Sequence, residues 1–191
     1  MTRGQYLRLG TILSLLAAVI IEAILLLLLL GASPYTLFSP PTVYLMGLLL
    51  VIGVAVYRAY LNSTIHARTY MERVSPLALL VAFVAIVAGW YGYPWAVALV
   101  PVAYFVEEAV GLKLMRDFEE YDAEGARLFA AGMTLFVFTL PLVVVTSYVA
   151  ILTLLGNTVK ALGLAKVMGS TSTTFRAEGR LEAGRRRAPL M

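Results

Sequence analysis

The sequence predicts an all-α, polytopic integral membrane protein with about six transmembrane helices. Hydrophobic residues make up 61% of the 191 positions and charged residues only 14%, whereas a soluble domain carries roughly 25% charged residues. Mean hydropathy is +0.86, and the apolar residues gather in blocks of about 20, the length that spans a bilayer as a helix. We therefore expect residues 1–168 to form one helical bundle with lipid as its solvent.

The composition excludes several classes of function. The chain has no cysteine, which rules out disulfides, thiolate metal sites and cysteine nucleophiles. His66 is the only histidine, so no Ser/His/Asp set and no bis-histidine haem site is expected, and His66 itself is given no role. No cofactor motif is present, and we expect no cofactor. The net charge of +4 indicates contact with lipid headgroups and not with nucleic acid. The expected partners are the lipid bilayer and other membrane subunits or further copies of this chain.

The first half of the chain predicts two spans. Residues 9–30 form an apolar run that exceeds the roughly 7–15 residues of a cleaved signal peptide, so it is interpreted as a first span, with cleavage near 31–33 as the alternative. Residues 31–42 are uncharged and rich in proline, as in a short connection. A second span is predicted over 43–61, followed by a polar loop over 62–75.

The middle of the chain predicts a helical hairpin. Residues 76–115 are long enough for two spans of about 20 residues each. The turn is expected in the sequence WYGYPW at 90–95. Glycine and proline break helices, and the aromatic rings suit the boundary between acyl chains and headgroups.

The segment 128–168 allows two interpretations. As two spans, it would break near Thr146 and Ser147, with Pro141 as a kink. As one span, it would end near Gly156 and continue as an interfacial helix, giving five spans, because Lys160 is costly near the centre of a span. From residue 169 the chain is small, polar and basic, and 169–191 is predicted to be a disordered tail.

The distribution of charge favours six spans. Basic residues lie in the segments 58–73 and 113–127, while 31–42 and 90–95 have none. Because cytoplasmic loops carry an excess of lysine and arginine, the N-terminus and both charged loops are predicted to be cytoplasmic in the cell membrane. The basic tail joins them on that side only if the number of spans is even.

Two ionisable residues are expected deep in the membrane. Glu22 lies near the middle of the first span, on a helical stripe that is predicted to pack against other helices and includes Thr11, Ser14 and Ala18. Lys160 lies near the middle of the sixth span and needs a counter-charge. Glu22 is predicted to be its partner, since both lie near the midplane. A proton or cation site at Glu22 is the alternative.

Glu107 and Glu108 are adjacent near the cytoplasmic end of the fourth span. They lie about 100° apart around the helix and about 10 Å inside its end, from the helical twist and rise. One carboxylate is expected to face the bundle interior and the other the headgroups. Ionisable groups inside membranes are often functional, so this pair is a candidate site.

Asp117, Glu120 and Glu124 follow at i, i+3 and i+7, a spacing that would align three carboxylates on one helical face. Such a row could hold a divalent cation, because hard cations take several oxygen ligands. It could equally be a solvated face, with Lys113–Asp117 and Arg116–Glu120 as ordinary i, i+4 pairs. Whether a metal binds there is left open.

The sequence RDFEEY at 116–121 resembles the second aspartate-rich motif of UbiA-type membrane prenyltransferases. The resemblance implies that these acids hold magnesium on a prenyl diphosphate at the cytoplasmic face. The chain departs from the family pattern because glutamates replace two aspartates and no Asn-Asp-x-x-Asp motif is present.

Three functional classes follow. A non-catalytic accessory or structural membrane subunit is favoured, because the residues form no complete catalytic or cofactor-binding set. A small transporter or channel using Glu22 and Glu107 is the second hypothesis. A magnesium-dependent prenyl or lipid transferase is the third, and it depends on residues 116–124 alone.

Overall fold

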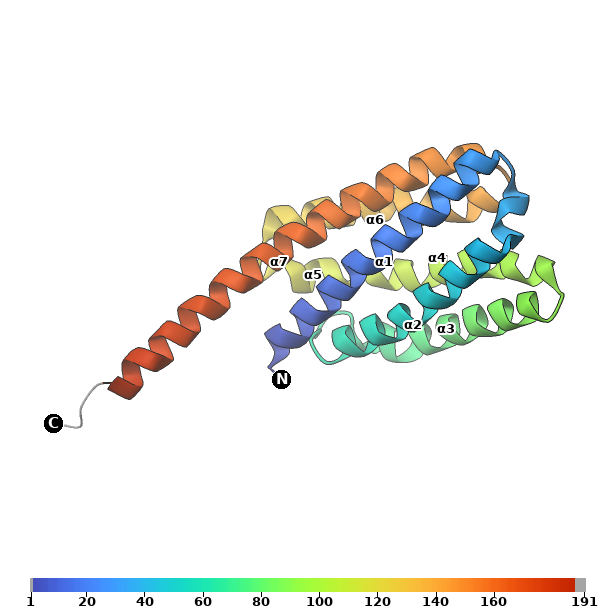
Figure 1. Cartoon of the computed structure of the whole chain (residues 1–191). Helices are drawn as coiled ribbons and strands as arrows, with labels where there is room; N and C mark the ends of the chain where they lie inside the picture. Colours follow the sequence, from blue (N-terminus) through green and yellow to red (C-terminus); the bar gives the residue numbers. More distant parts are fainter. Residues whose placement is uncertain (1, 188–191) are drawn as a thin grey trace.

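A computed structural model of the chain describes the backbone of residues 2–187 and the side chains of residues 2–171. This part of the chain is helical and contains no strand. In chain order, the helices are α1 (Arg3–Gly31), α2 (Pro40–Leu61), α3 (Arg68–Trp90), α4 (Leu99–Gly111), α5 (Leu114–Glu119), α6 (Ala123–Thr139) and α7 (Ala150–Arg187) (Figure 1). Short 3₁₀ helices lie between them: η1 (Pro34–Phe38), η2 (Pro94–Ala98), η3 (Leu140–Val144) and η4 (Ser147–Val149).

Six helical segments of the described chain are long and apolar enough to cross a membrane. They are Arg3–Gly31, Pro40–Leu61, Arg68–Trp90, Pro94–Gly111, Ala123–Val144 and Ser147–Thr171. The all-α prediction is confirmed, and the five-helix alternative is wrong. The fifth and sixth segments separate at Thr146, whose extended backbone (φ −150°, ψ 129°) interrupts the helical path, as the sequence predicted.

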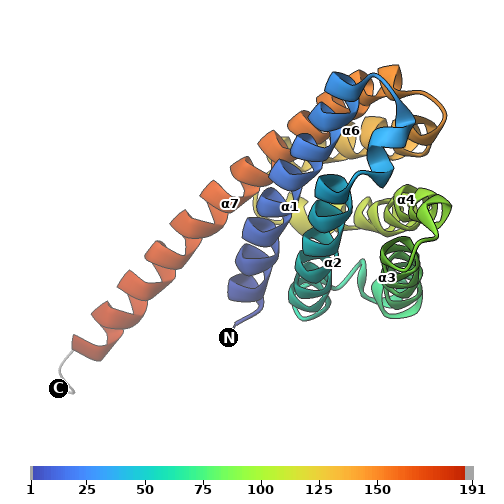
Figure 2. The ribbon, with the colours of Figure 1, turned by 45° about the vertical axis from the view of Figure 1, so that its right-hand side comes forward.

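The six long segments form a closed ring. Each packs mainly on two neighbours, in the order α1, α2, α3, α4, α6, α7 and back to α1. In Figure 2, α1 lies between α7 and α2, and α3 and α4 lie together beyond α2. Helices far apart in sequence therefore meet across the interior of the ring, and their inward side chains share one space.

The α6–α7 hairpin has the closest helix packing in the ring. A Cβ atom added to Gly132 would lie 2.1 Å from the Lys160 backbone nitrogen, and one added to Gly163 would lie 2.3 Å from that of Phe129. Only glycine permits backbones to approach so closely, and small residues are the usual means of helix packing in lipid. The contact also fixes the rotation of α7 at Lys160.

The two ends of the bundle differ in charge. One end holds the start of α1, the α2–α3 connection, α5 and the start of α6, and most of the charged residues of the described chain lie there (Figure 1). Connections at the opposite end, residues 32–39, 91–98 and 140–149, carry no charge. Exposed aromatic residues at this end include Tyr35, Trp90, Tyr91, Tyr93, Trp95 and Tyr148, as expected at a membrane boundary. We call these the charged end and the uncharged end.

The predicted hairpin turn at 90–95 is confirmed, because α3 ends at Trp90 and Gly92 has a φ of +93° that favours glycine. The predicted polar loop over 62–75 is too long, since α3 begins at Arg68. A salt bridge of 2.9 Å from Arg68 to Glu72, one turn later, supports the first turn of α3. Of the predicted disordered tail, 169–191, residues 188–191 and the side chains of 172–187 lie outside the described residues, so that prediction remains untested.

Candidate functional site

A cavity of about 80 Å³ lies inside the ring, and all six long helical segments contribute to its wall. It occupies the half of the bundle nearer the charged end, because Met71, Gly111 and Leu114 line it beside the α2–α3 and α4–α5 connections. Its polar lining residues are Ser14, Tyr60, Tyr104, Glu107, Glu108 and Lys160. A space of this size holds a few water molecules or a small ion.

Lys160 and Glu108 form an ion pair across the cavity. The Lys160 Nζ atom lies 3.1 Å from Glu108 Oε1, and the two side chains are only 4% and 17% exposed. Nζ also lies 4.2 Å from the ring centroid of Phe136, within the range of a cation–π contact. The predicted pairing of Lys160 with Glu22 is therefore wrong, because the contact of α7 with Gly132 of α6 directs Lys160 into the ring, toward α4.

Among the described side chains, Glu107 is the carboxylate of the cavity that forms no ion pair. Its Oε2 atom is buried and accepts no hydrogen bond of good geometry from the residues that the structure describes. The Ser75 hydroxyl of α3 lies beside it, and Tyr104, one turn earlier on α4, also lines the cavity. Within the described part of the chain, neither hydroxyl forms a hydrogen bond of good geometry. Unpaired buried polar atoms are costly. A proton, a water molecule or a small cation bound among these three groups would relieve that cost.

The expectation that one of the two glutamates faces the headgroups is wrong, since both line the cavity. The two carboxylates contact different helices. Glu108 reaches α7 on one side through Lys160, while Glu107 lies beside Ser75 of α3 on the other. The rotation of about 100° between adjacent residues thus places both carboxylates on the cavity wall.

Glu22 lies outside the cavity. It is half-buried on α1, and its Oε1 accepts a hydrogen bond of 3.0 Å from the Thr158 hydroxyl of α7. The rest of its stripe packs on other helices as predicted, since Thr11 and Ala18 are buried and the Ser14 hydroxyl bonds the Tyr60 hydroxyl at 3.1 Å. Glu22 therefore contributes to the α1–α7 contact and not to the cavity.

A second polar cluster lies at the charged end, around Asp117. Its side chain is fully buried, and its Oδ1 accepts hydrogen bonds from the Ile65 backbone N–H at 2.8 Å and from Arg3 Nη2 at 3.2 Å. Arg3 also contacts Glu120 Oε2 at 3.2 Å and donates from Nε to the Ser63 carbonyl at 2.6 Å. Arg3 thereby joins the start of α1 to the α2–α3 connection and to α5.

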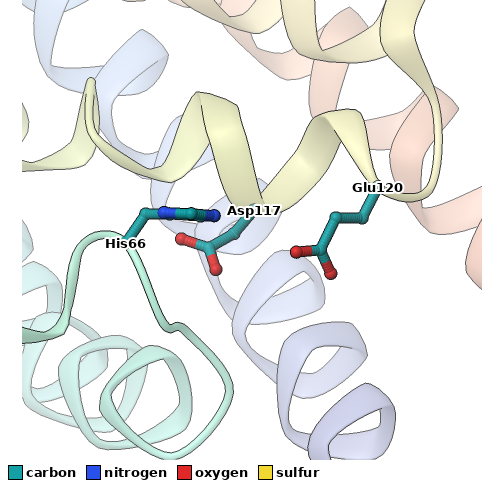
Figure 3. A group of neighbouring side chains, drawn as sticks. All are labelled: His66, Asp117 and Glu120. Carbon is teal, nitrogen blue, oxygen red and sulfur yellow. The ribbon is translucent and has the colours of Figure 1, made fainter.

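His66, to which sequence analysis assigned no role, joins the same cluster. One ligand atom from each of His66, Asp117 and Glu120 lies within 4.8 Å of the others, and Figure 3 shows the Asp117 carboxylate between the other two side chains. His66 lies in the loop before α3, and the other two residues belong to α5 and its end. No local sequence pattern links the loop to α5.

The predicted row of three carboxylates is wrong at Glu124. Helix α5 ends at Glu119, and α6 starts at Ala123 with Asp122 as its N-cap, so Asp117 and Glu124 lie on different helices. Glu124 pairs with Lys166 of α7. Asp117 and Glu120 pair with Arg3 instead of the expected Lys113 and Arg116.

Asp122 accepts a hydrogen bond of 2.7 Å from the Gly125 backbone N–H and another of 2.7 Å from the Ser170 hydroxyl. Both bonds hold the pKa of the Asp122 carboxyl below its usual range, and the bond from Gly125 makes the larger contribution. Asp122 thus fixes both the start of α6 and its contact with the end of the sixth span.

A second, wholly apolar cavity of about 40 Å³ lies toward the uncharged end. It shares Ile21, Leu49 and Tyr104 with the polar cavity, so the two spaces lie one above the other along the bundle. The remaining wall is apolar, with residues such as Leu28, Phe136 and Leu140. The polar cavity is therefore separated from the uncharged end by an apolar layer.

Fold and site together define a bundle of six apolar helices with an internal polar cavity displaced toward one end. No protein-family model, no curated protein and no solved structure matches this chain. The resemblance of residues 116–121 to UbiA-type prenyltransferases thus stays a local one, and function has to be argued from the site.

Proposed function

We propose that the protein is a small membrane transporter that binds a proton at Glu107. The observation that carries this proposal is the buried, unpartnered Oε2 of Glu107 in a cavity inside a ring of six apolar helices. Ionisable groups that face the interior of a membrane bundle commonly mark proton and ion pathways. Part of the Glu107 surface remains accessible, which gives a proton a route to the carboxylate.

The neighbouring ion pair supports the assignment to Glu107 over Glu108. Lys160 already neutralises the charge of Glu108. Glu108 therefore keeps its counter-charge whether or not Glu107 binds a proton. Glu107 has no counter-charge among the described side chains, and it changes the net charge of the cavity when it takes up or releases a proton. The Ser75 and Tyr104 hydroxyls beside it are able to exchange hydrogen bonds with either form.

The apolar layer supplies the gate. A charged or hydrated species cannot pass through packed apolar side chains without a rearrangement, and hydrophobic constrictions gate other membrane pores in this way. A proton bound to Glu107 from the charged end is released toward the uncharged end only after the helices around Ile21, Leu49 and Tyr104 separate. The protein is therefore proposed to alternate between two states and not to form an open pore.

The test is proton flux into liposomes that contain the purified chain. A potassium diffusion potential set with valinomycin drives proton entry, and a pH-sensitive dye inside the vesicles reports it. We expect flux above that of protein-free liposomes, and loss of that excess in Glu107→Gln. Glu72→Gln is the matched control, because Glu72 is an exposed carboxylate on α3 outside the cavity. Wild-type flux equal to that of empty liposomes, or full flux in Glu107→Gln, would contradict the proposal.

We further propose that the charged end and both termini face the cytoplasm. The basic residues in the segments at this end, set against the uncharged connections at the other, support this orientation. Reporter fusions after residue 169 and within the connection at 32–39 distinguish the two sides. A cytoplasmic signal from the fusion at 32–39 would reverse the assignment.

An accessory subunit is the second candidate. The backbone of α7 continues to Arg187 and extends well past the other helices at the charged end (Figure 1), which gives a partner protein a helix on which to pack. In this case the isolated chain conducts no protons, and a chain truncated after residue 171 loses its partner while its bundle melts as before. Flux from the full-length chain alone favours the transporter.

A further inference from the structure

The cluster around Asp117 carries a second inference, which does not depend on the transport proposal. His66, Asp117 and Glu120 come from two separate elements, yet one potential ligand atom of each lies within 4.8 Å of the others. Asp117 is 0% exposed, a rare condition for a carboxylate unless it is paired or binds a metal. Its position between the other two side chains is visible in Figure 3.

The hydrogen bonds of the cluster leave one side of it unsatisfied. Asp117 Oδ1 accepts from Ile65 and Arg3, but Asp117 Oδ2 is buried and has no hydrogen-bond partner among the described residues. Arg3 contacts Oε2 of Glu120 at 3.2 Å. A buried oxygen that lacks a hydrogen bond costs stability, and here it lies in a group that also offers an imidazole nitrogen and a second carboxylate.

We propose that His66, Asp117 and Glu120 bind one divalent transition-metal ion of the Zn²⁺ class. An imidazole with two carboxylates suits Zn²⁺ and its first-row neighbours, whereas Mg²⁺ prefers oxygen ligands alone. Three protein ligands leave a further coordination position for water. Since His66 and Glu120 are exposed, the ion has access from solvent at the charged end.

Arg3 has a defined part in this site. Metal-binding carboxylates are themselves usually held by hydrogen bonds that orient them, and Arg3 holds one oxygen of each carboxylate. Its positive charge leaves the group with a net charge of about −1 when His66 is neutral, which limits the affinity for a divalent ion. The bound metal would fasten the α2–α3 connection to α5, directly beside the cavity residues Met71 and Leu114.

The experiment is a calorimetric titration of the full chain with Zn²⁺, in detergent micelles and without a polyhistidine tag. We expect one ion per chain and a rise in the melting temperature on binding, because a ligand of the folded state stabilises it. His66→Gln and Glu120→Gln should each weaken binding by roughly tenfold or more, since loss of even an outer-shell partner commonly costs that much. Glu119→Gln is the matched control, an exposed carboxylate one residue away, and should bind like the wild type.

His66→Gln and Glu120→Gln change exposed side chains, and thermal melting without metal verifies that these two variants fold. Absence of saturable Zn²⁺ binding by the wild type overturns the proposal. Binding that is unchanged in His66→Gln also overturns it, because the ion would then lie elsewhere. The visible absorption of bound Co²⁺ provides an independent readout, and the proposal requires that this spectrum change in His66→Gln.

Discussion

Lys160 of α7 and Glu108 of α4 are 52 residues apart in sequence, yet Nζ and Oε1 lie 3.1 Å from each other inside the ring. Burial of two charges is costly, and their attraction offsets that cost only while both are present. The pair therefore acts as a constraint on the arrangement of α4 and α7. Any alternative rotation of either helix leaves a charge without its partner.

Removing one member of this ion pair should destabilise the protein more than removing both members. Lys160→Met or Glu108→Gln alone leaves one buried charge unpaired and is expected to cost about 3–5 kcal/mol, whereas the double variant should lie closer to the wild type. A double-mutant cycle from denaturation in micelles measures the coupling. The same cycle of Lys160→Met with Glu22→Gln serves as the control and should be additive. Additive effects with Glu108→Gln would show that the ion pair contributes no coupling.

The glycine contact between α6 and α7 should tolerate no side chain at all. In Gly132→Ala the new methyl group would meet the Lys160 backbone nitrogen, and overpacking of this kind costs about 1–3 kcal/mol or more. Thermal melting should show a clear loss of stability. Gly169→Ala, where no atom of the described residues lies within 4 Å of the added atom, is the control and should melt at or slightly above the wild-type temperature, because alanine is the better helix former.

Loss of Arg3 should loosen the charged end. Arg3→Gln removes the guanidinium from Asp117 and Glu120, and since Asp117 is fully buried we expect a cost of about 1–3 kcal/mol. Hydrogen exchange of the Ile65 amide, which donates to Asp117, should accelerate. Arg8→Gln changes an exposed arginine on the same helix and should alter neither measurement. Equal effects of the two variants would mean that the Asp117 cluster does not depend on Arg3.

The lowered pKa of Asp122 predicts how the stability of the fold depends on pH. Its folded-state pKa lies below the ordinary value of 3.8, because the Gly125 N–H and the Ser170 hydroxyl donate to the carboxylate. A lowered pKa in the folded state stabilises the fold above pH 3.8, and that contribution is lost as the pH falls through the folded pKa. Melting temperatures between pH 7 and pH 3 should therefore fall more steeply for the wild type than for Asp122→Asn. Parallel curves would contradict the assignment.

The sequence predicted features that depend on local signals. The turn at 90–95 has glycine, proline and aromatics together, and the interruption at Thr146 follows a proline-containing segment within an apolar stretch of the length of two spans. Depth in the membrane, estimated from residue counts, correctly placed Lys160 inside the bundle. It did not identify the partner, because that depends on the rotation of α7, which a backbone contact with Gly132 determines.

The errors in the charged segment have a similar origin. Asp122 is a good N-cap residue with Glu124 in the following turn, and this signal would have separated Glu124 from the helix that holds Asp117. The approach of His66 to Asp117 has no such signal. The α2–α3 connection is held against α5 by Arg3, which donates to the Ser63 carbonyl, and by the Ile65 N–H, which donates to Asp117. Contacts between residues so far apart in the chain leave no periodic pattern in the sequence.

The position of Lys160 in the last span has a consequence for biosynthesis. A chain is made from its N-terminus, so α4 with Glu108 enters the bilayer before α7 is complete. Insertion of an isolated lysine at the centre of a helix costs about 2.5–3.5 kcal/mol on translocation scales. If α7 enters beside helices that are already assembled, the lysine meets its carboxylate as it leaves the translocation machinery. The order of synthesis thus avoids a step in which the Lys160 ammonium group faces lipid without its partner Glu108.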